Sequence, residues 1–379
     1  MQRPGSVTTT SKNAINVCIV AMHKEVKMKT QKTSNLLRVI AFFLTGVILV
    51  CTFGFTVDGW TKDKEPDGDI GSKPGQGENT QDDNEIPDTP TVAPPEVYYS
   101  ALTGIGTAKE LSNKAPTAFV MDKNAPCFGL YGAEIIIDIP TEQSNRLLCI
   151  RTDNENLWKI GSIAPARGYI SNFAKFFGAA QISYGTDEIV KYDSCSINLL
   201  HDLKANGSLC YSEYERYIYT NSDLISPMLQ DSELQATLPY TLAPLEERVA
   251  LESNATVIAF DDCELSYDED QTAYIWYEGK EQERDLINGK ELSFVNCLVL
   301  FADSVTYDNA GGCQMVMNTI GSGEGYYASL GGITRIRWTS SLSGNMSFFN
   351  ENGEPLVINR GNVYIRVLRS STFNDFFVS

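Results

Sequence analysis

The chain has 379 residues and carries 48 acidic against 30 basic side chains, which gives a formal net charge of −18 at pH 7. Because no basic cluster follows the first 38 residues, this charge argues against nucleic-acid binding and against a polybasic lipid-docking surface. The only histidines are His23 and His201, and the sequence has no H-E-x-x-H, G-x-S-x-G or Walker motif. Most histidine-based catalytic and zinc sites are therefore excluded.

An uncharged run of nineteen residues, from Val39 to Val57, is rich in valine, isoleucine, leucine and phenylalanine. At about 1.5 Å per residue, a helix of this length just spans a hydrocarbon core of about 30 Å. Residues 1–38 hold seven basic side chains and one acid, whereas residues 39–379 hold 23 basic and 47 acidic side chains. By the positive-inside rule we predict a cytoplasmic N-terminus (1–38), a transmembrane helix (39–57) and an extracytoplasmic remainder in a single-pass protein of the cell membrane.

Two alternatives to an uncleaved signal anchor stay open. Reading from Met28 gives a basic region followed by an apolar core, as in a secretory signal, so cleavage is the first alternative. Lipidation at Cys51 is the second, although Val50 stands where a lipoprotein cleavage site has a small residue. No Ala-x-Ala-like site follows the apolar run, and the uncleaved anchor is therefore the prediction adopted.

Residues 58–96 are predicted to form a disordered acidic linker. Between Thr61 and Glu96 lie six prolines, ten acids and three lysines, without one aromatic residue. Such a segment cannot bury enough apolar surface to offset its chain entropy. We expect an extended tether that holds the folded part away from the membrane.

Residues 97–379 have the length of two domains, or of one large domain, and two are predicted here. The first, 97–245, mixes β-rich runs with helical patterns, which predicts a mixed α/β domain. Strands are expected at Ala118–Met121, Glu134–Ile139 and Arg146–Arg151, and helices at Arg167–Phe177 and Ile197–Lys204.

The second predicted domain, 246–379, is β-rich, so that the fold class of the whole chain is α+β. Asn288-Gly289 and Asn352-Gly353 indicate turns. The glycines of Gly321-x-Gly323-x-Gly325 lead into a strand-like run, which favours a tight turn or bulge over a phosphate loop. Strands are expected at Thr256–Phe260, Ala273–Tyr277, Phe294–Phe301, Thr334–Trp338, Met346–Phe349 and Val363–Val367.

Several segments carry a resemblance to a known family. Residues 101–105 (A-L-T-G-I), 132–138 (G-A-E-I-I-I-D) and 159–167 (K-I-G through A-R) resemble P-L-T-G-L, Q-A-D-I-V-Y-E and K-I-G-P-V-R-S-A-R of the YerB-like family, in the same order. Residues 321–326 (G-S-G-E-G-Y) and 361–365 (G-N-V-Y-I) fit its C-terminal part. The resemblance implies an N-terminal and a C-terminal domain outside the bacterial membrane, in a family of lipoprotein-type proteins without an assigned activity.

This chain departs from that family at two places. Ala164 stands where the family has the first of two arginines, and only Arg167 is kept. A Pro-His-Asn segment typical of the family, before the match at Tyr219-Thr220, is absent. The departures imply that any family site built on those groups is altered here.

Arg167 is the first candidate for ligand binding. Pro165 is typical of the start of a helix, which places Arg167 in the first turn. A guanidinium beside a helix N-terminus forms an anion site, so the predicted ligand there is anionic. The alternative is a structural role, in which a neighbouring carboxylate holds Arg167.

Asp138, Glu142 and Arg146 complete the candidate ligand-binding set. The segment Pro140 to Asn145 joins two predicted strands as a hairpin-like loop, so Asp138 and Arg146 are expected to face each other at its base. The carboxylates of Asp138 and Glu142 would serve acid–base chemistry only if burial separated their pKa values. An exposed ion pair is the alternative.

The cysteines point to neither a metal site nor a disulfide scaffold. Seven of the nine follow the apolar run, their spacing is irregular, and no C-x-x-C occurs. Cys149 and Cys297 lie in apolar strands and are expected to be buried thiols. We predict no metal, no cofactor and no catalytic constellation.

Two hypotheses about function follow. The first is a membrane-anchored envelope protein that binds a ligand or protein partner of the cell envelope without catalysis. The alternative is an envelope enzyme, such as a hydrolase of wall material, that uses the carboxylates of Asp138 and Glu142.

Overall fold

The largest sheet joins strands from both halves of the chain. The structure is a computed structural model that describes residues 96–112, 114–187, 196–200, 209–214, 216–229, 234–260, 262–309 and 312–379, and within them this sheet has eleven strands. Neighbouring strands follow the order β12 (Ser253–Asn254), β22 (Gly332–Ser340), β21 (Gly321–Ser329), β18 (Asn296–Ala302), β25 (Val363–Arg369), β4 (Ile135–Pro140), β5 (Asn145–Arg151), β3 (Thr117–Asp122), β7 (Ala180–Ser183) and β8 (Ser196–Asn198), and β23 (Met346–Phe349) pairs with β22.

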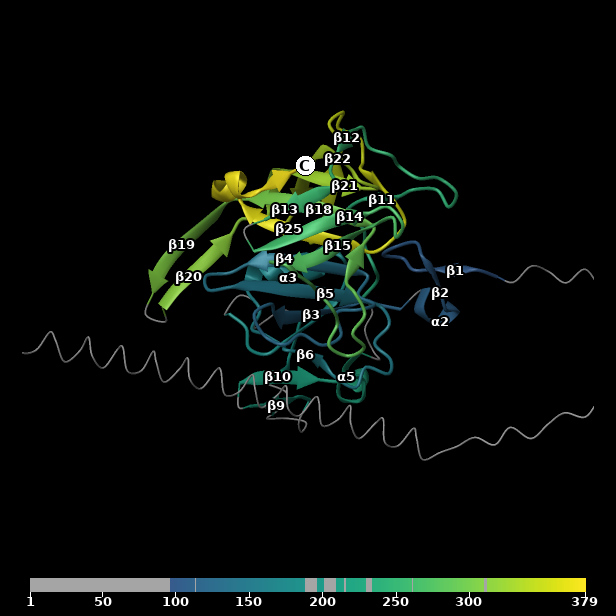
Figure 1. The fold of residues 1–379 in the computed structure, drawn as a ribbon. Helices are drawn as coiled ribbons and strands as arrows, with labels where there is room; N and C mark the ends of the chain where they lie inside the picture. Colours follow the sequence, from purple (N-terminus) through teal and green to yellow (C-terminus); the bar gives the residue numbers. More distant parts are fainter. Residues whose placement is uncertain are drawn as a thin grey trace, which may run out of the picture. The chain divides into compact units, whose positions relative to one another are not determined.

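The parallel pairing of β25 with β4 connects the two halves (Figure 1). On one side of this junction lie five strands from the first predicted domain, and on the other lie six from the second. The boundary at residue 245 stays a prediction, but the segments that flank it share one sheet. The described part of the chain is mainly β, with short helices at α2 (Lys109–Ser112), α3 (Gly168–Phe176), α5 (Ser222–Leu229) and the 3₁₀ helix η2 (Ser370–Asp375).

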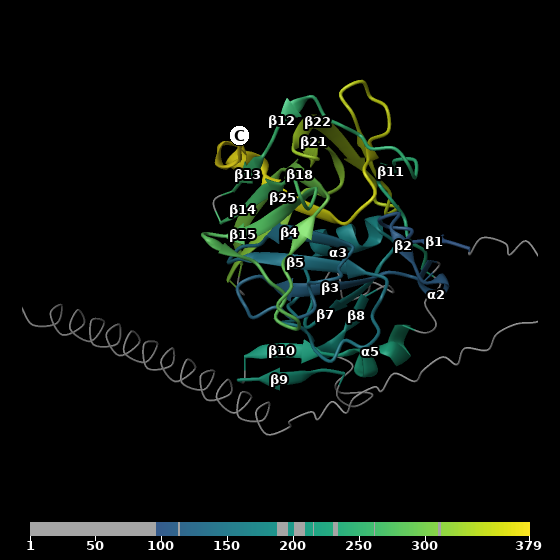
Figure 2. The ribbon, with the colours of Figure 1, turned by 45° about the vertical axis from the view of Figure 1, so that its right-hand side comes forward.

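A second sheet packs on one face of the first. Its order is β16 (Glu281–Gln282), β15 (Ala273–Glu278), β14 (Cys263–Asp268), β13 (Val257–Ala259) and β26 (Phe377–Val378), with β17 (Ser293–Phe294) paired to β15. The smaller sheets are β6 (Ile160–Gly161), β10 (Tyr217–Thr220) and β9 (Tyr211–Glu213), then β1 (Tyr98–Tyr99) with β2 (Gly106–Thr107), β11 (Thr241–Leu242) with β24 (Val357–Ile358), and β19 (Ser304–Asn309) with β20 (Gly312–Met317). Figure 2 shows β9, β10 and α5 at the end of the molecule opposite β12 and β22.

Side chains of the large sheet alternate between two apolar cores, because successive residues of a strand point to opposite faces. On β4, Ile135, Ile137 and Ile139 enter the core that includes α3. Ile136 enters the core shared with the second sheet. The strands at the centre of the large sheet are therefore covered on both sides, as their nearly continuous apolar sequences require.

Most predicted elements are confirmed within one or two residues at each end. The three strands expected before residue 152 are β3, β4 and β5, and the helix expected at Arg167–Phe177 is α3. The later strand predictions correspond to β13, β15, β17 with β18, β22, β23 and β25. The hairpin at Pro140 to Asn145 also forms, because these two residues are cross-strand partners.

Two predictions are corrected. Gly321, Gly323 and Gly325 form no turn but begin strand β21, where a Cβ on Gly325 would lie 2.3 Å from the Val299 carbonyl oxygen. Close approach of neighbouring strands, rather than turn geometry, requires glycine there. The helix predicted at Ile197–Lys204 starts too early, because Ile197 belongs to strand β8 and pairs with Ile182; Leu199 and Leu200 are helical, and residues 201–204 lie outside the described residues.

The predicted segments 1–38 and 39–57, His201, and the linker 58–96 except Glu96 lie outside the described residues. Among the residues that are described, no helix combines the length and apolar character needed to cross a bilayer.

Candidate functional site

Asp138 is a carboxylate buried between the large sheet and the second sheet. It follows Ile137 on β4 and therefore points, like Ile136, toward the second sheet. Its side chain is completely buried. Since an unpaired buried carboxylate is strongly disfavoured, the surrounding residues must supply positive charge and hydrogen-bond donors.

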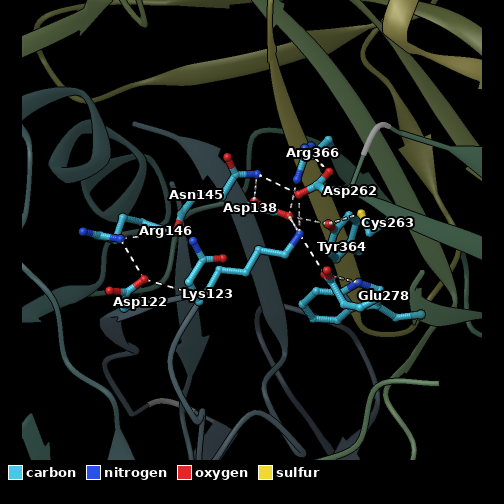
Figure 3. Close-up of polar contacts among 12 residues, drawn as sticks. Asp122, Lys123, Asp138, Asn145, Arg146, Asp262, Cys263, Glu278, Tyr364 and Arg366 are labelled. Carbon is cyan, nitrogen blue, oxygen red and sulfur yellow. Dashed lines mark hydrogen bonds and ion pairs between the residues drawn. The ribbon is translucent and has the colours of Figure 1, made fainter. Parts of the chain in front are cut away.

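Four side chains supply them (Figure 3). Lys123 Nζ lies 2.8 Å from Asp138 Oδ2, and the Arg366 guanidinium donates to the same oxygen. The Tyr364 hydroxyl donates to Oδ2 at 2.9 Å, and Asn145 Nδ2 donates to Oδ1 at 2.8 Å. Tyr364 and Arg366 come from β25, the parallel neighbour of β4, so the contacts cross the junction between the two halves of the sheet.

The network continues toward the surface through two further carboxylates. Asp262 accepts hydrogen bonds from Arg366 at 2.6 Å and from Lys123 at 2.8 Å. Glu278, at the end of β15, lies 2.8 Å from Lys123 Nζ. Lys123 and Glu278 also line a cleft of about 300 Å³, which connects the buried charges with solvent.

The pKa values follow from this arrangement. Burial raises the pKa of Asp138, but the positive charges of Arg366 and Lys123 outweigh it and hold the pKa below its ordinary value. Burial lowers the pKa of Lys123, but the negative charge of Asp138 raises it, and the net pKa lies above the ordinary value. Asp138 and its two cationic partners are therefore charged at neutral pH.

Asp138, Asp262 and Cys263 bring potential metal ligand atoms within 4.8 Å of one another. Both carboxylates already accept hydrogen bonds from Lys123 and Arg366. A metal ion there would face the positive charges of the Lys123 ammonium and the Arg366 guanidinium. The arrangement therefore suits an internal ion-pair network better than a metal centre.

Arg167 does not lie in the first turn of a helix, because α3 begins one residue later and Arg167 is its N-cap. Its Nη2 and Nε atoms contact Glu142 Oε1 at 2.5 and 3.2 Å. The backbone N–H of Gly168 donates to Asp187 Oδ2 at 2.8 Å. Both features that predicted an anion site, the guanidinium and the helix N-terminus, thus have carboxylates of the chain itself as partners.

Arg146 does not face Asp138, which corrects the predicted pair. Its cross-strand neighbours are Ile139 and Asp122, and its Nη1 atom lies 2.9 Å from Asp122 Oδ1. Figure 3 shows Arg146 turned toward Asp122 and away from the Asp138 network. The prediction failed because the register places residue 147, not residue 146, opposite residue 138.

The four predicted residues therefore form separate groups. Asp138 belongs to the buried network, Glu142 pairs with Arg167, and Arg146 pairs with Asp122. None of the four lines the cleft beside Lys123.

Sequence reasoning missed a larger cleft. Its volume is about 490 Å³, and it lies between residues 100–153 and residues 271–295, together with Asn362. Glu134 lines it, accepting hydrogen bonds from the Ser100 hydroxyl and from the Thr152 backbone N–H. No local motif indicates this cleft, because its walls are remote in sequence.

Sequence reasoning also missed Glu278 and Glu283, which line the cleft beside Lys123. Burial raises the pKa of Glu278. Burial and the nearby charge of Glu278 raise that of Glu283. These two acids, unlike Asp138 and Glu142, therefore have raised pKa values.

Comparison with known proteins finds one matching family model and one solved structure with a similar fold. Residues 255–365 match the family model described as "Protein of unknown function (DUF3048) C-terminal domain". The crystal structure of the YerB protein from Bacillus subtilis matches with a TM-score of 0.63 and 19% sequence identity, over 74% of this chain and 99% of that chain. The resemblance to the YerB-like family is confirmed. No curated protein matches significantly.

The YerB match shows the shared fold, and it covers nearly all of the solved YerB chain. The matched family model ends within β25, the strand that carries Tyr364 and Arg366. The ionic network therefore connects β25, the strand in which the match to the DUF3048 C-terminal model ends, with β4 of the preceding segment.

Proposed function

We propose that this chain is a membrane-anchored, extracytoplasmic protein of the cell envelope that binds a ligand without transforming it. The anchor is the apolar run 39–57, and its orientation follows from the basic residues before it. The observation that carries the binding proposal is the cleft of about 490 Å³. This volume falls in the range typical of small-ligand sites, roughly 300–1,000 Å³.

The cleft favours a ligand that donates hydrogen bonds. Its lining contains the carboxylates of Glu134, Asp153 and Glu291, and among the described residues it contains no lysine, arginine or histidine. Glu291 is paired with Arg284, which leaves Glu134 and Asp153 as the principal acceptors. Tyr131 adds an aromatic wall with a 41% exposed side chain. Amino and hydroxyl groups, as carried by amino sugars, are complementary to this lining.

The hydrolase alternative has less support. Asp138 is completely buried, and its cationic partners lower its pKa. Burial raises the pKa of Glu142, but the hydrogen bond from Arg167 outweighs this effect, so its pKa is lowered as well. A general acid needs a raised pKa. Neither residue lines the Glu134 cleft or the cleft beside Lys123.

The test uses the full-length chain in detergent micelles and purified bacterial cell wall. We expect the protein to sediment with the wall while no soluble wall fragments are released. Glu134→Gln, which keeps the shape of the side chain and removes its charge, should weaken binding about tenfold or more. Glu269→Gln is the matched control, since Glu269 is exposed and lies outside the cleft.

Soluble competitors identify the recognised group. Glucosamine, which carries an ammonium group, should displace the wall, whereas N-acetylglucosamine should compete less well if charge contributes. Fragment release that Glu142→Gln abolishes would establish the hydrolase instead. Wall binding unchanged by both Glu134→Gln and Asp153→Asn would refute the proposed cleft.

A further inference from the structure

Two arginines without an ionic partner lie side by side on β22. Ile336 and Trp338 point into the core that includes α3, so Arg335 and Arg337 point to the other face and are exposed. Within the described residues, neither guanidinium has a carboxylate oxygen within 4.0 Å or a hydrogen-bond partner.

Both arginines line a cleft of about 210 Å³ that shares no lining residue with the Glu134 cleft. Its aromatic wall consists of Phe301, Tyr326 and Phe373. The ring centroids of Phe301 and Phe373 lie 5.0 Å apart, and those of Phe301 and Tyr326 lie 6.3 Å apart. Phe373 remains 48% exposed, so its ring is available to a ligand.

The spacing of the two guanidinium groups suits an oxyanion with several terminal oxygens. Residues two apart on a strand have Cα atoms about 6.6 Å apart and side chains on one face. Like charges at this separation repel each other, and a bound anion removes that repulsion. A carboxylate satisfies one guanidinium in bidentate geometry, whereas a phosphoryl group offers oxygens to both.

We propose that this cleft binds a phosphate-bearing ligand whose phosphoryl group lies between Arg335 and Arg337 and whose attached apolar or aromatic group packs on the aromatic wall. This site goes beyond the wall-binding function proposed above and does not depend on it. Glu324, the cross-strand neighbour of Arg337, and Glu351 also line the cleft, and their charges oppose an anion. They restrict binding to ligands that contact both guanidinium groups and the wall.

Binding is measured by isothermal titration calorimetry on the full-length chain in detergent micelles, with phenyl phosphate, inorganic phosphate and benzoate as probes. Phenyl phosphate should bind more tightly than either of the other two. Arg335→Gln and Arg337→Gln should each weaken phenyl phosphate binding about tenfold or more. Because Arg248 is likewise without an ion pair among the described residues and lies outside the cleft, Arg248→Gln is the matched control.

Two further variants separate the parts of the site. Phe373→Ala should abolish the preference for phenyl phosphate over inorganic phosphate, while affinity for inorganic phosphate stays unchanged. Glu351→Gln should strengthen binding of both phosphates, because it removes a repulsive charge.

Thermal unfolding of each variant distinguishes loss of the site from loss of the fold. The proposal is overturned if phenyl phosphate shows no saturable binding to the folded protein. It is also overturned if binding is the same in Arg335→Gln, Arg337→Gln and Arg248→Gln. Tighter binding of benzoate than of phenyl phosphate would equally exclude a phosphate site.

Discussion

Asp138 and Arg366 occupy directly paired positions on neighbouring parallel strands, although they are 228 residues apart in the chain. Both point toward the second sheet, on the same side of the large sheet as Ile136 and Tyr364. A shift of one residue in the β4–β25 register would turn either side chain toward the opposite core. We interpret the ion pair as a device that specifies how the two halves of the sheet join, a role known for other buried polar groups.

Removing the charge of Asp138 should therefore be costly. We expect Asp138→Asn to lower the free energy of unfolding by about 3–5 kcal/mol, because Lys123 and Arg366 lose a shared buried partner. Asp122→Asn, which breaks the more exposed pair with Arg146, should cost about 1 kcal/mol or less. Urea unfolding measures both, and equal effects would contradict the assigned role of the network.

The same network predicts an acid-sensitive fold. Since the folded-state pKa of Asp138 is lowered, its contribution is fully present above the pKa of an unfolded aspartate, about 3.9, and is lost as pH falls through the folded value. Glu278 has a raised pKa, so its contribution is present below about pH 4.3 and is lost as pH rises through its folded pKa. The fall of the melting temperature with acid should therefore be shallower in Asp138→Asn than in the wild-type protein, because only Glu142 then retains a lowered pKa among these groups, and it should persist in Glu278→Gln.

Arg167 should prove structural. Arg167→Ala leaves the Glu142 carboxylate, whose side chain is 5% exposed, without its guanidinium partner. A buried acceptor without its donor costs about 1–3 kcal/mol, which chemical denaturation can measure. Phenyl phosphate affinity should not change in this variant. A loss of affinity without a loss of stability would show that Arg167 binds ligand after all.

Thiol reactivity should follow burial. The described cysteines form no disulfide, and Cys149 and Cys297 are buried, as their apolar strands predicted. Burial raises the pKa of Cys149 to about 12, so its reactive thiolate is scarce at neutral pH. Cys313 is exposed and, among the described cysteines, should react first with a maleimide. Peptide mapping by mass spectrometry measures this order, and labelling of Cys149 before unfolding would contradict it.

Gly325 should tolerate no side chain. A Cβ atom added at this position would lie 2.3 Å from the Val299 carbonyl oxygen, in the pairing of β18 with β21. Gly325→Ala should destabilise the protein by about 1–3 kcal/mol through overpacking. Gly106→Ala is the control, because its nearest atom would lie 4.0 Å away. Similar melting temperatures for the two variants would show that the strands separate without cost.

Local patterns predicted the strands well, because alternating or continuous apolar runs between turn residues depend on short-range chemistry. The sequence also predicted, as an alternative to ligand binding, that a neighbouring carboxylate holds Arg167. Local patterns did not predict which strands pair, since the partners of Asp138 on β25 are more than 200 residues away in sequence. Even within one hairpin, an error of one residue in register gave Arg146 the wrong partner.

The clefts were beyond sequence reasoning for a related reason. Arg335 and Arg337 follow the alternation of β22 and look like ordinary exposed residues. They matter because neither guanidinium forms an ion pair among the described residues, although Glu324 and Glu351 line the same cleft, and because Phe373 of η2 forms part of the cleft wall. Neither property is encoded in the neighbouring sequence.

The junction between β4 and β25 also has a consequence for biosynthesis. A chain synthesised from its N-terminus produces β3, β4 and β5 long before β25, the strand that covers the other edge of β4. Until then, Ile135, Ile136 and Ile137 lie on an unpaired strand edge of the kind that promotes aggregation. The nascent protein thus depends on late, long-range closure, so its risk of aggregation is greatest before β25 has been synthesised and paired with β4.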